Sequence, residues 1–348
     1  MTVVAVDANG ADLGPGEVAA GARIAAQQGV EILLFGPAAQ LGEAVSGIEI
    51  VDAPVSIAKD PDPVRAVRGT PHASIVQAAR AVAEGRAQAL VCNGSTGAAL
   101  VAGQLAIRRA PGVHRPALAL TLPVPGRPVT LLDVGANADV RPEILVQFAF
   151  MGAAYASAML GVARPRVGLL SNGSEAERGS QLVLETHARL AAQCAGSDAL
   201  VFIGNVEGSG LTQGVADVVV TDGFTGNVAL KLVEGVSQAT LGAIRDVAEA
   251  SVRGRVGGML LQTGLRAFRE EIDPERQGGA YLLGLRQLGV LAHGSFTRHG
   301  IARAIVRARR GAEEDLVGRT HRALEAAGAL RRHDLLSVTD DTVLGGDP

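Results

Sequence analysis

Short apolar segments that alternate with alanine-rich stretches limit the possible folds of this 348-residue chain more than any other feature. The apolar segments are continuous and lack the polar residue at every second position that marks a strand with one face in water. Continuous apolar strands fit a sheet that helices cover on both faces. We therefore predict a three-layer αβα fold with a mainly parallel sheet and crossover helices. The expected strands span residues 3–6, 32–35, 89–91, 130–132, 167–170, 201–203, 217–220 and 288–291.

Aromatic residues are scarce: the chain has seven Phe, two Tyr and no Trp, although 47% of its residues are hydrophobic. So little aromatic surface does not suit base stacking on nucleic acid. The formal net charge of -3 provides no general attraction to a polyanion either. We expect no nucleic-acid partner.

Only two of the 32 basic residues are lysines, Lys59 and Lys231. Neither is followed by Ser or Thr, so the chain lacks the phosphate-binding P-loop motif. The two cysteines, Cys92 and Cys194, form no Cys-x-x-Cys pair, which predicts neither a zinc framework nor a disulfide scaffold. The N-terminus shows no secretion-signal pattern. We expect a cytoplasmic protein that uses no metal and no cofactor.

The chain contains no linker-like segment before residue 330, and we expect residues 1–330 to form a single α/β catalytic domain. The charged residues 331–348 are expected to be a flexible C-terminal tail. Residues 144–163 carry no charge and are long enough to span a membrane. Their content of small residues, together with Gln147, favours a buried helix at a core or subunit interface instead.

Two stretches, residues 85–97 and 214–226, repeat one pattern: an expected strand, a Gly-x-Thr-Gly turn and an apolar helix. Such a turn leaves backbone N–H groups free at a helix N-terminus, where they favour an anion. Two such turns from neighbouring strands can share one phosphate-sized site. The alternative is two ordinary strand-to-helix turns with Thr as N-cap. The candidate phosphate-binding residues are Gly94, Ser95, Thr96 and Gly97 in the first turn and Gly223, Thr225 and Gly226 in the second.

Polar side chains follow other expected strands. Asp7 and Asp12 come after the first strand, and Asp133 and Asn137 come after a later one. Open α/β sheets bind ligands at these carboxyl ends. Ordinary turn chemistry of Asp and Asn explains each pair equally well. A Gly-x-Ser-x-Gly nucleophile motif is absent from the sequence, so nothing here favours a covalent acyl-enzyme.

A polar stripe of Asn227, Lys231 and Glu234 lies on the helix expected after the second turn, otherwise formed by apolar residues. It either faces the candidate site or is a solvated helix face. His293, beside Gly294, follows another strand and is either a catalytic donor or a packed turn residue.

Residues 254–268 have a basic amphipathic pattern that suits contact with lipid or an apolar ligand. We extend this possible contact segment to residue 272. A helix within the core is the alternative. The arginines of this region are Arg253, Arg255, Arg266 and Arg269.

Taken in order, the motifs resemble the bacterial phosphate acyltransferases of phospholipid synthesis, the PlsX family. The resemblance covers about residues 1–310, and its most specific block is 217–235. The other blocks lie at residues 6–15, 93–98, 115–118, 131–137, 202–208, 278–284 and 293–295.

The chain departs from the family pattern at several positions. Asn9 and Ala11 are unusual in the first block, and Arg178 stands where the family has lysine. Ala73 and Phe296 each occupy a position where the family has serine. These departures weaken any role for a lysine at 178 or a serine at 73 and 296.

The resemblance implies transfer of a long-chain acyl group from acyl carrier protein to inorganic phosphate, which gives acyl phosphate for glycerol-3-phosphate acylation. It implies a homodimer with a fold similar to phosphotransacetylases and isopropylmalate dehydrogenases. The protein is expected to work on the inner membrane surface without spanning it, beside the downstream glycerol-3-phosphate acyltransferase.

From the chemistry of this reaction we hypothesise roles for individual residues. Lys231 neutralises phosphate charge, and His293 donates a hydrogen bond to the oxyanion or to the departing sulfur. Asp222 and Asn227 belong to the catalytic block, because they lie in the most specific motif. The residues expected to shape the cleft are Asp7, Asp12, Asp133, Asn137, Glu175, Asn205 and Arg68.

Three other functions remain open at this point. A short-chain phosphate acyltransferase that uses acyl-CoA is the nearest. A metal-dependent NAD dehydrogenase of the related fold is the second, although residues 14–19 match the dinucleotide fingerprint only weakly and suit the first turn of a helix better. A non-catalytic scaffold at the membrane is the third.

Overall fold

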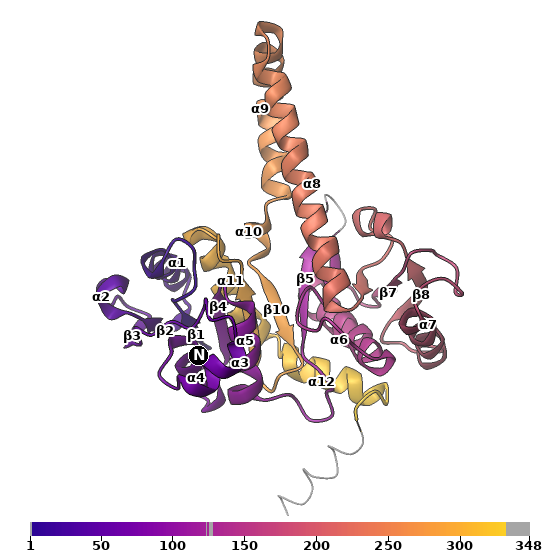
Figure 1. Ribbon diagram of the computed structural model, residues 1–348, viewed down its shortest axis with the longest axis horizontal. Coiled ribbons are helices and arrows are strands. Elements are labelled where there is room, and N and C mark those ends of the chain that lie inside the picture. The colour runs from indigo at the N-terminus through magenta and orange to yellow at the C-terminus, as the bar shows by residue number, and fades with distance from the viewer. Residues whose placement is uncertain (1, 123, 125–127, 332–348) are drawn as a thin grey trace, which may run out of the picture.

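In the part of the chain that the structure describes, a single sheet of eleven strands forms the centre of the protein (Figure 1). The computed structural model describes residues 2–331 except 123 and 125–127. The strand order across the sheet is β3-β2-β1-β4-β11-β10-β5-β6-β9-β7-β8. The strands are β1 (Val3–Asp7), β2 (Glu31–Gly36), β3 (Ile48–Asp52), β4 (Ala89–Asn93), β5 (Ala117–Leu122), β6 (Val129–Leu132), β7 (Arg166–Leu170), β8 (Val201–Val206), β9 (Val218–Val220), β10 (Ala280–Leu283) and β11 (Leu288–Ala292).

The sheet is mainly parallel, as predicted, and two strands interrupt it. The pairs from β3 through β11 are parallel, and so are the pairs from β6 through β8. Strands β10 and β5 lie between these two sets and pair antiparallel with their neighbours. The predicted proximity of the two Gly-x-Thr-Gly turns is therefore wrong in one respect: β4 and β9, which precede them, are separated by β11, β10, β5 and β6.

Helices cover both faces of the sheet and confirm the three layers. One apolar core contains Val4 and Val6 of β1 with residues of α1, α6, α11 and α12. The other contains Ala5 of the same strand with residues of α4 and α5. The helices are α1 (Pro15–Gln27), α2 (Ala38–Leu41), α3 (Pro63–Gly69), α4 (Ser74–Ala83), α5 (Thr96–Ala102), α6 (Pro142–Leu160), α7 (Gln181–Gln193), α8 (Gly223–Glu249), α9 (Val252–Glu271), α10 (Pro274–Gln277), α11 (Arg298–Glu313) and α12 (Leu316–Ala326).

Helix α6 corresponds to the uncharged segment at 144–163. In the described part of the chain it is the one helix long and apolar enough to cross a membrane, and 78% of that stretch is buried inside the protein. Its one internal amide, Gln147, is fully buried and donates to the carbonyl oxygens of Gly112 and Ala329. The prediction of a buried helix is confirmed, because the core satisfies both the apolar surface and the amide.

Helices α8 and α9 form a long antiparallel pair that projects from the body, and we call it the hairpin (Figure 1). Ser251 caps α9 by accepting a hydrogen bond from the N–H of Gly254. No residue of α9 is buried, so a core helix is the wrong interpretation of residues 254–268. After α9 the chain returns to the body through α10, which leads into β10.

The predicted tail at 331–348 lies outside the described residues, apart from Arg331. The N–H of Arg331 donates to the carbonyl oxygen of Gly112. This bond holds the end of the described chain against the body.

Candidate active site

The loops that follow β1, β4 and β11 meet at one edge of the sheet. The N–H of Asp12 donates to the carbonyl oxygen of Gly294 at 2.8 Å, and the N–H of Gly94 donates to that of Ala292 at 3.1 Å. Gly94 has φ of +77°, and a side chain there would collide with the carbonyl oxygen of Gly10. Glycine is therefore required at Gly94, because no larger residue permits this approach of the two loops.

A buried polar chain lies under this group of loops. The Asp7 carboxyl is 3% exposed and is hydrogen-bonded to the hydroxyl of Ser74 at the start of α4. The Ser74 Oγ in turn accepts a hydrogen bond from Asn9 Nδ2 at 2.9 Å. Asp7 has no ion-pair partner among the described residues, and burial raises its pKa to about 7. A carboxyl that titrates near neutral pH is suited to proton transfer.

Asn93 ends β4 beside Asp7, and the sequence analysis did not single it out. Its Nδ2 donates to the carbonyl oxygen of Asp7 at 3.0 Å. Its Oδ1 is buried and accepts no hydrogen bond in the described part of the chain. A buried acceptor without a donor is costly, which makes Asn93 a candidate site residue. The sequence signal that could have identified Asn93 is its position just before Gly94 of the first turn.

The first Gly-x-Thr-Gly turn keeps free donors. Ser95 is the N-cap of α5 and makes no side-chain cap, so the alternative with Thr as N-cap is wrong here. Among the described residues, the N–H groups of Thr96, Gly97 and Ala98 bond to no acceptor. Helix α5 continues directly into the π-helical segment Gly103–Ile107. These free N–H groups at a helix start suit an anion such as phosphate.

His293 lies at the same edge, beyond the end of β11. Its Nδ1 lies 2.8 Å from Ser295 Oγ and accepts a hydrogen bond from the Ser295 N–H at 3.3 Å. Because the N–H can only donate, Nδ1 is the acceptor and the ring proton of the neutral imidazole is on Nε2. The exposed imidazole therefore presents an N–H donor, as the interpretation of His293 requires.

Asp133 and Asn137 belong to a second group, at the carboxyl end of β6. The Asp133 carboxylate is fully buried and accepts hydrogen bonds from Asn137 through both its N–H and its Nδ2, each at 2.8 Å. The N–H groups of Leu118, Gly135 and Ala136 donate to its other oxygen. Burial raises the Asp133 pKa, and these bonds oppose that rise. With five donors bound, Asp133 holds the loop together and has no free capacity for substrate.

The second Gly-x-Thr-Gly turn is occupied by protein acceptors. Asp222, not Thr, is the N-cap of α8, and it accepts hydrogen bonds from the N–H and the Oγ1 of Thr225, both at 2.7 Å. The N–H of Gly223 donates to the Asn137 carbonyl oxygen, and that of Gly226 to Asp222. A phosphate cradle at Gly223, Thr225 and Gly226 is therefore the wrong interpretation, because these N–H groups are used and a carboxylate already lies at the helix end.

The polar stripe on α8 starts at this second group. Asn227 Nδ2 donates to the carbonyl oxygen of Val134 at 3.0 Å. Lys231 Nζ lies 2.8 Å from Glu234 Oε2, and the Lys231 side chain is 50% exposed. Asn227 is therefore exposed and attached to the loop after β6, and the amine of Lys231 is accessible.

Glu175 and Asn205 form a third group, at the ends of β7 and β8. Asn205 Nδ2 donates to the carbonyl oxygens of Glu175 and Arg178, and its Oδ1 lies 3.0 Å from His187 Nδ1. Glu175 and Arg178 form an exposed ion pair at 3.7 Å. These contacts stabilise a loop. Arg68 lies exposed on α3 and forms no ion pair with any described residue.

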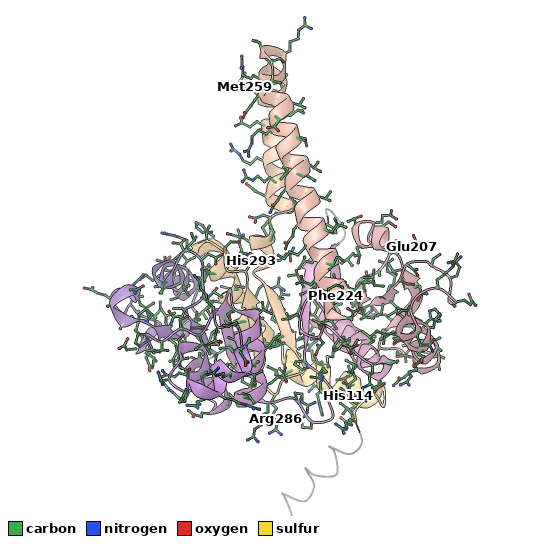
Figure 2. All side chains as sticks on the ribbon, viewed as in Figure 1. His114, Glu207, Phe224, Met259, Arg286 and His293 are labelled. Atoms are coloured by element: carbon green, nitrogen blue, oxygen red, sulfur yellow. The ribbon has the colours of Figure 1, made fainter. Side chains whose placement is uncertain are left out.

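The structure thus divides the predicted site residues into three groups. Asp7, Asp12, the first turn and His293 lie together. No hydrogen bond or ion pair of the described residues connects them to the β6–β9 group or to the β7–β8 group. Figure 2 shows His293 and Phe224, which belong to the first and second groups, both near the base of the hairpin. Three antiparallel pairings lie between the two sets, so β6, β9, β7 and β8 run opposite to β1, β4 and β11, and their carboxyl ends do not share one edge of the sheet. Strand twist of about 20–25° per pair also rotates one set relative to the other.

Metal ligands do not gather in the described residues: no group of three or more His, Cys, Asp and Glu side chains there is placed to hold a metal ion. The segment at 14–19 is the first turn of α1, with Pro15 as its first residue. The helical interpretation of this segment is confirmed.

Known structures share the architecture. The chain matches the EutD phosphotransacetylase from Staphylococcus aureus with a TM-score of 0.59 and 16% identity, over 89% of this chain and 94% of that one. A phosphotransacetylase from Streptococcus pyogenes matches with a TM-score of 0.60 and 15% identity, over 90% and 94% of the chains. These matches assign the chain to the three-layer α/β fold that the two phosphotransacetylases share.

Sequence relatives make the assignment more specific. The phosphate acyltransferase of Anoxybacillus flavithermus is 41% identical over 320 residues, 90% of this chain and 96% of that protein. That of Levilactobacillus brevis is 45% identical over 302 residues, 84% and 86% of the two chains. The family model described as "Fatty acid synthesis protein" matches residues 2–319. The chain belongs to this fatty acid synthesis protein family, and the resemblance found in its motifs is confirmed.

Proposed function

We propose that this protein transfers a long-chain fatty acyl group from acyl carrier protein to inorganic phosphate, forming acyl phosphate and free carrier protein. The observation that carries the proposal is identity of 41–45% with phosphate acyltransferases over at least 84% of the chain. The group of residues around the first turn supports it chemically, because it combines free backbone N–H donors with an imidazole N–H donor.

The proposed reaction needs no nucleophile from the protein. A phosphate oxygen attacks the thioester carbonyl carbon and forms a C–O bond, and the carbonyl oxygen gains negative charge in the tetrahedral state. The C–S bond then breaks, and the electron pair leaves with the carrier sulfur as a thiolate. Hydrogen phosphate is already a dianion at neutral pH and a thiolate leaves readily, so positioning and charge stabilisation supply most of the catalysis.

Three parts of the site have distinct roles in this proposal. The N–H groups of Thr96, Gly97 and Ala98 hold phosphate oxygens. The Nε2–H of His293 donates to the developing oxyanion or to the departing sulfur. Lys231 belongs to the second group and is paired with Glu234, and its accessible amine is the mobile positive charge that would approach the phosphate during the reaction.

The hairpin is proposed as the contact with the membrane surface. Its tip exposes apolar side chains, among them Met259, Leu260 and Leu261, and Figure 2 places Met259 near the end of the projection. Exposed arginines flank them on α9, at positions 253, 255, 266 and 269. Apolar residues between basic ones suit anionic lipid, and the same arginines suit the acidic carrier protein.

A homodimer fits the apolar side of α8. Phe224, Val228, Leu232 and Val236 follow one another at four-residue spacing, and each is more than half exposed. Such a stripe on a helix is buried favourably against a second copy of the chain. Residues 1–330 then act as one catalytic unit in each copy. We place the dimer in the cytoplasm at the inner membrane face, where a glycerol-3-phosphate acyltransferase uses the acyl phosphate.

The test compares two acyl donors with the purified protein. Palmitoyl carrier protein and acetyl-CoA are each incubated with and without inorganic phosphate, and the released thiol is measured. We expect thiol release that depends on phosphate and is at least tenfold faster with the carrier protein. Faster release from acetyl-CoA would instead assign the short-chain reaction. Absence of any phosphate-dependent thiol release would favour a non-catalytic scaffold at the membrane.

A further inference from the structure

Helix α10 follows α9 directly, and we call it the base of the hairpin. Its residue Glu275 attaches it to the loop that carries His293. The Glu275 carboxylate accepts two hydrogen bonds from Thr297, one from its N–H and one from its Oγ1, each at 2.8 Å. Thr297 is the N-cap of α11, so a side chain from the hairpin base satisfies the start of this helix.

Only three residues separate Thr297 from His293. Within that loop, the Phe296 N–H donates to the His293 carbonyl oxygen at 3.1 Å, and the two rings lie 6.1 Å apart. Gly300 packs closely against both the Phe296 ring and the Glu275 side chain. A shift of Glu275 would therefore move Thr297 at one end of the 293–297 loop and, through the packed Phe296, His293 at the other end.

Helix α10 is itself held on the body. Arg307 of α11 donates through Nη1 to the carbonyl oxygen of Gln277 and through Nη2 to Tyr155 Oη. Gly278, at the end of α10, packs against the Arg307 side chain. Helix α10 thus contacts α11 at two points, Thr297 at its start and Arg307 farther along it, and a displacement of α10 acts on the start of α11 through Thr297.

We infer that Glu275 is a positioning residue, which fixes the His293 loop from the base of the hairpin. His293 is held for acyl transfer only while Glu275 keeps its hydrogen bonds to Thr297. This inference rests on the proposed function, in which His293 is the donor. It adds that the surface bound by the hairpin and the site of reaction are mechanically connected through one carboxylate.

The chain contains a matched control. Glu17 of α1 approaches the same end of α11 and accepts hydrogen bonds from Arg298 through its N–H at 2.8 Å and its Nη2 at 2.7 Å. The Arg298 guanidinium lowers the pKa of the Glu17 carboxyl. Glu17→Gln and Glu275→Gln therefore remove the same kind of carboxylate from the same helix end, but only Glu275 belongs to the hairpin base.

The experiment measures hydrogen exchange of the Phe296 amide in the parent and both variants, without lipid. We expect Glu275→Gln to exchange about tenfold faster than the parent and Glu17→Gln to stay within twofold. Thr297→Val, which keeps the N–H bond and loses the hydroxyl bond, should show about a threefold increase. Equal exchange in the two Gln variants would overturn the inference, and Thr297→Val decides the matter if Glu275→Gln does not fold.

A kinetic arm separates this inference from the proposed function. In acyl-phosphate formation, Glu275→Gln should lower kcat at least fivefold with KM for phosphate within twofold, whereas Glu17→Gln changes neither by more than twofold. Vesicles of phosphatidylglycerol should stimulate the parent and Glu17→Gln but not Glu275→Gln. A response of Glu275→Gln equal to that of the parent would contradict the inference. If the parent forms no acyl phosphate, the proposed function fails, and the exchange measurement alone decides the role of Glu275.

Discussion

Asp133→Asn distinguishes a structural carboxylate from a substrate-binding one. One Asp133 oxygen accepts hydrogen bonds from the N–H and the Nδ2 of Asn137, and the other accepts three backbone N–H groups. An asparagine amide provides a single oxygen. With that oxygen facing the three backbone donors, its NH₂ group faces the two donors of Asn137, and both lose their acceptor.

The expected loss of stability follows from this geometry. Each buried donor without an acceptor costs about 1–3 kcal/mol, so two cost about 3 kcal/mol near the lower part of that range. Unfolding entropy near 60 °C is about 2.1 cal/mol/K per residue, or about 0.7 kcal/mol/K for roughly 330 residues. We therefore expect the midpoint of thermal unfolding to fall by about 4 °C at pH 7.5.

Calorimetry and phosphate kinetics together decide the outcome. The midpoint should fall as calculated, while KM for phosphate stays within about twofold, since no Asp133 oxygen is free for substrate. Asp12→Asn, at an exposed position, is the control and should shift the midpoint by less than about 1 °C. A midpoint shift below 1 °C together with a tenfold increase in KM would refute the structural role.

Three further predictions concern charge and surface. Burial raises the Asp7 pKa to about 7, so the folded state keeps a proton that the unfolded state has lost above about pH 4, and stability falls as pH rises. The free energy of unfolding should therefore fall by about 2–3 kcal/mol between pH 5 and 8 because of Asp7. In urea unfolding, Asp7→Asn should lack this decrease. Lys231→Ala should reduce kcat/KM for phosphate by about tenfold or more, while Lys59→Ala stays within twofold; equal effects in steady-state assays would remove the charge role. Leu260→Ser changes a side chain that is 82% exposed and should reduce sedimentation with anionic vesicles at least threefold, with Val215→Ser as a control that binds like the parent.

The layers of the fold follow from the sequence, because short continuous apolar runs that alternate with alanine-rich stretches favour strands buried on both faces. The reversal in the middle of the sheet does not follow. Strands β5 and β10 were not predicted: β5 has the composition of a helix fragment, and β10 has only four residues. Their pairing joins residues about 160 positions apart, such as Ala119 and Tyr281, and no local pattern encodes it.

The polar residues after the strands lie in turns, one of the two interpretations left open by the sequence, but their division into separate groups was not predictable. Both Gly-x-Thr-Gly turns lead into helices, as expected. What separates them is one capping residue: Asp222 fills the start of α8, whereas Ser95 leaves the start of α5 open. The order of strands also places the two turns apart, so the two Gly-x-Thr-Gly sequences have different roles in the structure.

The most direct test of the central claim uses phosphate labelled with ¹⁸O at all four oxygens. The purified protein is incubated with palmitoyl carrier protein, and the lipid product is analysed by mass spectrometry. Attack by a phosphate oxygen on the thioester predicts palmitoyl phosphate that retains all four labelled oxygens, in an amount equal to the free carrier thiol. Release of carrier thiol with unlabelled palmitate and no acyl phosphate would contradict the account.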